Sequence, residues 1–268
     1  MGQKGFFTDA TLCIGCKACE VACKQWNQLP GDGFVFTGMS YDNTGHLGAS
    51  SWRHVAFVEK EKLPPPITFD AQSGAPQLSW LMVSDVCKHC RDAACLEACP
   101  TGAIVRTEFD SVYVQPDVCN GCGYCVTACP FGVIDRHETD GRAWKCTLCY
   151  DRTKADLDPA CAKACPTASI VYGDLDELAE RAHRRVDELH ARGVDSAFLY
   201  GLDAREQPGT GGLNAFFLLT DRPEVYNLPP APVTPTKRNG DSWRALAVAS
   251  AGLALASLGA VLWGRGKA

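Results

Sequence analysis

The sequence has no long basic stretch and no excess of positive charge. Its formal net charge is −5 and its isoelectric point is about 5.7. A nucleic-acid-binding protein would show a basic patch or stripe, so that class of function is not expected. The first residues, MGQKGFFTDATLC, contain no apolar core of a signal peptide, and no cysteine follows Cys165. Domains held together by disulfides are usually short and secreted, so a disulfide framework is a poor account of the cysteines in this 268-residue chain.

What the sequence does contain is sixteen cysteines, all between Cys13 and Cys165. They fall into four groups of four, with none left over. The groups are Cys13, Cys16, Cys19 and Cys23; Cys87, Cys90, Cys95 and Cys99; Cys119, Cys122, Cys125 and Cys129; and Cys146, Cys149, Cys161 and Cys165.

The spacing within the groups predicts iron–sulfur clusters. Groups one and three follow C-x2-C-x2-C-x3-C, and group three adds the proline that ends this run in bacterial ferredoxins. In groups two and four the third cysteine stands two and nine residues further on. Three closely spaced thiolates wrap three corners of a cubane, and the fourth cysteine ligates the partner cluster in two-cluster ferredoxins. Zinc is the alternative, since C-x2-C pairs also make tetrahedral zinc sites, but zinc does not require triplets followed by C-x3-C-P.

Three polar residues stand in or beside the groups. His89, inside group two, is interpreted as lying around a cluster or on the surface, because four cysteines are already present. Imidazole ligation of iron, as in Rieske centres, is the alternative. Lys88 and Lys145 adjoin Cys87 and Cys146. Either their charge tunes the cluster potential or they are ordinary solvated lysines.

Five segments carry a resemblance to a known family. They are TLCIGCKACEVACKQWN at 11–27, CGYCVTACPFGV at 122–133, KCTLCYDR at 145–152, PACAKACPTASIVYGD at 159–174 and FFLLTDRPEVYNLP at 216–229. The chain resembles the four-cluster iron–sulfur subunits that partner molybdopterin oxidoreductases, and most of all the beta subunit of formate dehydrogenase. The resemblance implies an α+β fold with two ferredoxin-like 2x[4Fe-4S] modules, an insertion and one C-terminal transmembrane helix. It also implies four [4Fe–4S] clusters as the cofactors.

The family resemblance further implies how the cysteines pair. Groups one and four would exchange their last cysteines, and so would groups two and three. The four ligand sets implied for iron are Cys13, Cys16, Cys19 and Cys165; Cys146, Cys149, Cys161 and Cys23; Cys87, Cys90, Cys95 and Cys129; and Cys119, Cys122, Cys125 and Cys99. No catalytic residue is expected.

The organisation along the chain follows from these groups. Strands are expected at 52–59, 79–84 and 111–115 and after each C-P turn, and an amphipathic helix from Asp174 to Arg192. The stretch before residue 80 has a glycine-rich run at 31–38 and a proline-rich break at 63–69, and it covers clusters, meets a partner or decorates the surface. The expected segments are residues 1–80, with the first group and an insertion, packing with 141–173; 81–140, a ferredoxin-like module; 141–227, with the fourth group, a helix and a cap; 228–242, a proline-rich linker; and 243–264, a transmembrane helix.

The segment from Ala245 to Gly264 contains no charged residue and only two serines. Twenty helical residues cover about 30 Å, the thickness of a hydrocarbon core. Trp243 and Trp263 stand near its ends, where interfacial tryptophans are found. A membrane helix is therefore expected, with a buried helix of a soluble protein as the alternative. Basic residues lie on both sides of the helix, so they do not indicate its orientation in the membrane. The resemblance implies that the cluster domain lies on the outer, periplasmic face of the cytoplasmic membrane; a position on the cytoplasmic face is the alternative.

Taken together, the sequence predicts an electron-transfer subunit that is not an enzyme by itself. By resemblance it relays electrons from a catalytic alpha subunit, with a molybdenum or tungsten pterin, to a membrane cytochrome b gamma subunit and quinone in a formate dehydrogenase. The lipid bilayer is the other expected partner, and nucleic acid is not. Two alternatives stay open. One is the same role in a hydrogenase or in a polysulfide, thiosulfate or sulfoxide reductase. The other is a zinc-binding scaffold for assembly.

Overall fold

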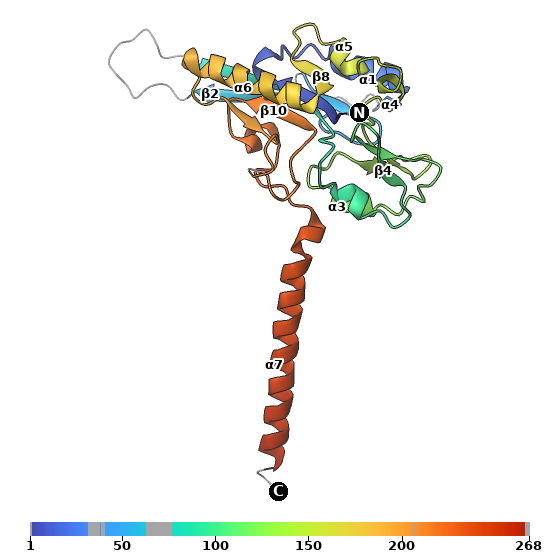
Figure 1. Cartoon of the computed structure of the whole chain (residues 1–268), viewed down its shortest axis with the longest axis vertical. Coiled ribbons are helices and arrows are strands. Elements are labelled where there is room, and N and C mark those ends of the chain that lie inside the picture. The colour runs from blue at the N-terminus through green and yellow to red at the C-terminus, as the bar shows by residue number, and fades with distance from the viewer. Residues whose placement is uncertain (1, 32–37, 39–40, 63–76, 206, 266–268) are drawn as a thin grey trace, which may run out of the picture.

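The computed structural model describes residues 2–31, 38, 41–62, 77–205 and 207–265. Within them, the fold is mixed α and β, as expected, with a C-terminal helix that stands clear of the body (Figure 1). The proline-rich break at 63–69 lies outside the described residues, as does nearly all of the glycine-rich run at 31–38. The division of the chain into segments stays a prediction.

A four-stranded sheet forms the centre of the body. Its order is β8-β1-β10-β9, in which β1 pairs parallel with β10 and the outer pairs are antiparallel. Successive side chains of a strand face opposite sides of a sheet, so Phe7 packs towards α6 and Phe6 packs towards the cysteines. The sheet is therefore buried on both faces. The strands are β1 (Lys4–Asp9), β8 (Ile170–Asp174), β9 (Phe198–Tyr200) and β10 (Ala215–Leu219).

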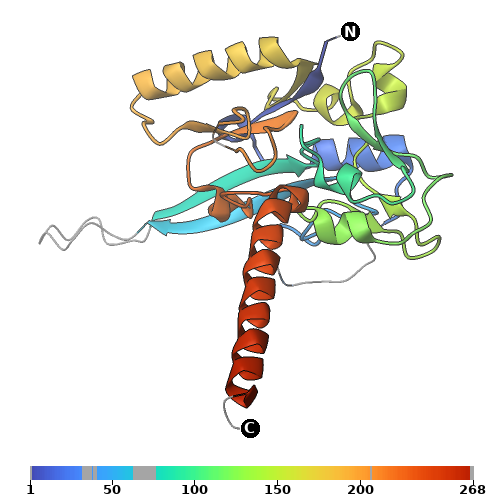
Figure 2. The same cartoon turned by 60° about the horizontal axis from the view of Figure 1, so that its bottom comes forward.

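One long amphipathic helix, α6 (Leu175–Ala191), covers one face of this sheet, on the far side of the body from the C-terminal helix (Figure 2). Leu178, Ala182 and Leu189 are buried there against Phe216 and Leu218. The amphipathic helix expected from Asp174 to Arg192 is confirmed, and β8 is the strand expected before it.

A long antiparallel hairpin pairs β2 (Arg53–Lys62) with β3 (Gln77–Val86). These are the strands expected at 52–59 and 79–84. The end of the hairpin nearest the cysteines is buried: Trp52, Arg53 and Val55 are all inside the protein. For this part of the stretch before residue 80, surface decoration is therefore the wrong interpretation.

The cysteine groups sit on short helices and hairpins beside this framework. Groups one and four lie around facing helices, and groups two and three lie around a second pair with two small antiparallel ladders. The strands expected near 111–115 and after the C-P turns are present. The elements are η1 (Ala10–Leu12), α1 (Ala18–Asn27), α2 (Ala94–Glu97), β4 (Ile104–Arg106), β5 (Val112–Val114), α3 (Tyr124–Ala128), β6 (Asp135–Arg136), β7 (Ala143–Trp144), α4 (Tyr150–Thr153) and α5 (Ala160–Lys163).

The chain reaches its last helix along the surface of the body. After η2 (Pro223–Tyr226), Leu228 and Thr234 are buried, and the Thr234 hydroxyl donates a hydrogen bond to the Asp92 carbonyl at 2.8 Å. The proline-rich linker thus packs on the protein. Then η3 (Pro235–Arg238) leads into α7 (Asn239–Arg265). The stretch Pro235–Ala260 is long and apolar enough to cross a membrane, and its apolar window is not buried in the protein.

Candidate functional site

The sixteen cysteines come together at four places, each taking three cysteines from one group and one from another. The structure thus brings together the members of each set named above; that they ligate iron stays a prediction. Three places are cavities with four cysteines in their walls, and at the fourth Cys125 lies beside the other three members. We name them site I (Cys13, Cys16, Cys19 and Cys165), site II (Cys23, Cys146, Cys149 and Cys161), site III (Cys87, Cys90, Cys95 and Cys129) and site IV (Cys99, Cys119, Cys122 and Cys125).

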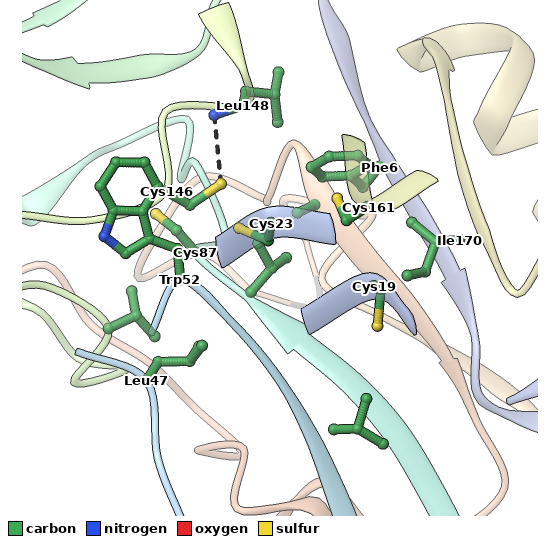
Figure 3. Close-up of a cluster of buried hydrophobic side chains, with 14 residues drawn as sticks. Phe6, Cys19, Cys23, Leu47, Trp52, Cys87, Cys146, Leu148, Cys161 and Ile170 are labelled. Atoms are coloured by element: carbon green, nitrogen blue, oxygen red, sulfur yellow. Dashed lines mark hydrogen bonds between the residues drawn. The ribbon is translucent and has the colours of Figure 1, made fainter. Parts of the chain in front are cut away.

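Sites I and II share the helix α1. Cys19 and Cys23 both lie on it, and Cys146 and Cys161 approach from later parts of the sequence (Figure 3). The backbone amide of Leu148 donates to the Cys146 sulfur at 3.4 Å, as the dashed line in the figure shows. Hydrogen bonds of this kind favour the thiolate form that binds metal.

Glycines allow two of the cysteine loops to turn sharply. Gly15 and Gly121 each precede the second cysteine of a group, with φ of +67° and +75°. A side chain at either position would be strained. It would also have no room, since a Cβ would lie 2.6 Å from the Met82 sulfur at Gly15 and 2.6 Å from the Gly141 carbonyl oxygen at Gly121. These loops are therefore fixed in the shape that gathers the cysteines.

Cys165 of site I and Cys99 of site IV each precede a proline, and their surroundings match. Burial acts to raise the pKa of Cys99, but hydrogen bonds from the Thr101 hydroxyl and from nearby backbone amides lower it overall. At Cys165 the Thr167 hydroxyl and nearby amides lower the pKa against burial in the same way. The hydroxyl–sulfur distances are 3.6 Å at Cys99 and 3.7 Å at Cys165. Both turns are therefore built to hold a thiolate.

At several other cysteines burial raises the pKa of the free thiol. It raises the pKa of Cys19 to about 11, of Cys95 to about 12 and of Cys125 to about 11. A metal must displace these protons when it binds. The sites therefore suit groups that bind thiolate strongly enough to offset this cost, as iron–sulfur clusters do.

A single metal ion does not fit the arrangement. No three His, Cys, Asp or Glu side chains among the described residues are close enough to hold one ion. Four sulfurs around zinc, at about 2.3 Å each in a tetrahedron, would lie roughly 3.8 Å apart. A cubane of iron and sulfide is wider, because each cysteine binds a different iron. Four sulfurs at each site, too far apart among the described residues to hold one ion, disfavour the zinc alternative.

The polar residues beside the groups are buried, not solvated. His89, Lys88 and Lys145 are 1%, 1% and 2% exposed, so a surface position for His89 and ordinary solvated lysines are wrong interpretations. The His89 Nδ1 accepts a hydrogen bond from the Val112 amide at 3.0 Å, which places its proton on Nε2. Lys145 donates to the Val112 carbonyl and, at 3.0 Å, to the Cys146 carbonyl. His89 and Lys145 both line site III.

The four sites follow one another in a row. Neighbouring sites are close enough for a charge on one cysteine to act on a cysteine of the next. The pairs are Cys19 of site I with Cys161 of site II, Cys146 of site II with Cys87 of site III, and Cys95 of site III with Cys125 of site IV. At the two ends a cysteine is exposed, Cys16 in site I and Cys122 in site IV, whereas every cysteine of site II is buried.

Comparison with protein families identifies the same regions. A model described as a 4Fe-4S dicluster domain matches residues 78–175, and one described as a 4Fe-4S binding domain matches residues 10–26. Every one of the sixteen cysteines lies within one of these two matched segments. Binding of [4Fe–4S] clusters is therefore supported for the protein.

Three curated proteins illustrate its relatives. The iron–sulfur subunit of the nitrate-inducible formate dehydrogenase of Escherichia coli is 39% identical over 222 residues, which are 82% of this sequence and 69% of that subunit. The formate dehydrogenase iron–sulfur subunit of Haemophilus influenzae is 38% identical over 82% of this sequence and 66% of its own length. The B subunit of the anaerobic dimethyl sulfoxide reductase of Escherichia coli is 34% identical over 67% of this sequence and 77% of its own.

Proposed function

This protein belongs to the family of iron–sulfur electron-transfer subunits that includes those of formate dehydrogenase and dimethyl sulfoxide reductase, and we propose that it serves a membrane-bound formate dehydrogenase by holding four [4Fe–4S] clusters. The sixteen cysteines are the iron ligands, four at each of sites I to IV. The protein has no catalytic residue of its own and conducts electrons for a catalytic partner.

The observation that carries this proposal is the continuous row of four-cysteine sites. Each site combines four sulfurs from two parts of the sequence, and neighbouring sites lie within electrostatic range of one another. Bound [4Fe–4S] clusters supply one-electron redox chemistry whose potential depends on charge, burial and hydrogen bonds to sulfur. The polypeptide supplies those surroundings: thiolates, amide donors and a dry interior.

The two exposed ends of the row are where electrons enter and leave. Exposed apolar side chains flank both: Ile14 and Val21 lie near site I, and Val118 and Tyr124 lie near site IV. Exposed apolar side chains of this kind are typical of surfaces that bind another protein. Cys16 and Cys122 then lie at the two interfaces.

The position of the C-terminal helix supports an assignment of the entry and exit ends. Just before α7, Lys237 pairs with Asp92 and the Thr236 hydroxyl donates to Glu97. Glu97 lies on α2, which carries Cys95 of site III and leads to Cys99 of site IV. Site IV therefore lies in the module nearest α7. With α7 in the bilayer, electrons enter at site I and leave from site IV.

The partners follow from this direction. A catalytic alpha subunit with a molybdenum or tungsten pterin covers site I, and a membrane cytochrome b gamma subunit receives electrons from site IV and passes them to quinone. The helix α7 anchors the protein in the cytoplasmic membrane, with the cysteine sites on its outer face. Identity to the formate dehydrogenase subunits extends over 82% of the sequence, against 67% for the sulfoxide reductase subunit, which favours formate as the donor.

The experiment is to purify the assembled complex without oxygen and add substrates one at a time. Formate is expected to bleach the brown iron–sulfur absorbance of this subunit within the turnover time of the enzyme. Dimethyl sulfoxide added to the reduced complex is expected to leave the bleached spectrum unchanged. Clusters that ignore formate and are reoxidised by the sulfoxide would contradict the proposal and support the reductase alternative.

A further inference from the structure

The most deeply buried guanidinium among the described residues lies between two of the cysteine sites. Arg53, the first residue of β2, is 2% exposed, and its guanidinium lies over the Phe6 ring at 4.8 Å. It lines site II. An arginine side chain does not lose its proton in proteins, so this charge is permanent.

No carboxylate among the described residues pairs with this charge. The hydrogen bonds of Arg53 in that part of the structure go to the Ser84 carbonyl, the Ser84 hydroxyl and the Cys161 sulfur. Its Nε has no hydrogen-bond partner there. An unpaired buried charge destabilises a folded protein. The position therefore calls for a negative group, and among the described residues no carboxylate provides it.

The contacts of Arg53 join a ligand of one site to a ligand of the next. Its Nη2 donates to the Cys161 sulfur of site II at 3.3 Å, and its Nη1 lies 3.5 Å from the Ser84 hydroxyl oxygen. That hydroxyl lies 3.2 Å from the Cys19 sulfur of site I. Because a thiolate sulfur can only accept, the Ser84 hydroxyl donates to Cys19 once Cys19 is a thiolate. A single line of donors therefore runs between the two sites.

We propose that Arg53, with Ser84, is a positioning residue that raises the reduction potentials of the clusters in both site I and site II, by one buried charge shared between them. The proposal rests on the proposed function, because it requires clusters at these sites. The clusters with their four thiolates are the negative groups that balance the guanidinium.

The direction of the effect follows from charge. A reduced cluster carries one more negative charge than an oxidised one, so a nearby cation stabilises the reduced state more. Hydrogen bonds to the ligand sulfurs act in the same sense. Arg53 reaches Cys161 directly and Cys19 through Ser84, so loss of Ser84 should affect site I, whereas loss of Arg53 should affect both sites.

The test is a redox titration of the purified holoprotein, followed by electron paramagnetic resonance. Arg53→Met is expected to lower the midpoint potentials of two of the four clusters and leave the other two unchanged. Arg53→Lys keeps the positive charge but cannot contact Cys161 and Ser84 through two separate nitrogens, so the same two potentials should fall by less. Ser84→Ala should lower only the potential of site I. Cys16→Ser and Cys149→Ser, which each alter one site, identify the signals of sites I and II.

Arg184→Met is the matched control, since it removes the same charge from an exposed position on α6 and should shift none of the four potentials. Iron content is measured in every variant. If Arg53→Met loses clusters, the potentials of Ser84→Ala and Arg53→Lys test the role of Arg53 instead. Unchanged potentials of sites I and II in these variants, or equal shifts at all four clusters, would overturn the role of Arg53. A wild-type protein without cluster signals would instead refute the proposed function.

Discussion

Replacing Cys125 by serine in the assembled complex is expected to remove one cluster and to slow formate-driven quinone reduction by about 100-fold or more. Mutating a residue that only orients a metal ligand already costs about 10–100-fold, and Cys125 is itself a ligand in our proposal. Cys125 is buried in site IV, the last site before the membrane in our proposal. Its loss breaks the row at its end. Formate oxidation with a small dye should largely persist, because the dye takes electrons before that point.

Two assays on the same preparation measure this result, one with quinone and one with the dye, together with iron content. Thr127→Ala is the control. Thr127 lies on the same short helix, α3, and its hydroxyl donates to the Tyr124 carbonyl at 3.1 Å. Both rates should be unchanged in the control. If Cys125→Ser lost its cluster but still reduced quinone at the wild-type rate, site IV would not be on the path.

Ending the chain after Arg238 is expected to move the protein, expressed without its partners, from the membrane to the soluble fraction with its clusters retained. The truncation removes all of α7 and keeps the contacts of Thr236 and Lys237 with the body. Residues 240–260 of α7 are exposed, so the body loses no packing. All sixteen cysteines precede the cut.

A single substitution tests the same helix in the full-length protein. Lys in place of Leu255 puts a charge near the middle of the span, where lysine opposes membrane insertion by about 2.5–3.5 kcal/mol. Leu255→Val is the control and should leave the protein in the membrane. Membrane flotation and iron analysis report both properties. A truncated protein that still floats with the membrane would show that α7 is not the anchor.

The cysteine groups and most of the flanking strands are readable from the sequence, because both are local patterns. Cluster loops depend on a spacing of two or three residues, and α6 depends on apolar residues at helical intervals. The strands expected at 52–59 and 79–84 correspond to β2 and β3. The central sheet is not readable in this way, because the parallel pairing of β1 with β10 joins segments some two hundred residues apart.

The surroundings of the sites are hidden from the sequence for the same reason. Arg53 meets Cys161 across 108 positions, and only the folded hairpin brings it there. Nothing near Arg53 in the sequence marks it as buried, since it stands among polar and apolar residues alike. His89 and Lys145 adjoin or lie among the cysteines, yet their burial became visible only in the structure. The pairing of groups one with four and two with three came from the family resemblance and not from the spacing.

The central claim is that sites I to IV each hold a cubane of four irons and four sulfides. It is tested most directly by iron and acid-labile sulfide analysis of the anaerobically purified protein, with electron paramagnetic resonance after full reduction. The account predicts about sixteen irons and about sixteen sulfides per polypeptide, since each of four cubanes contributes four of each. It also predicts the signals of interacting reduced clusters. Stoichiometric zinc, or a colourless protein with no signal after reduction, would contradict it.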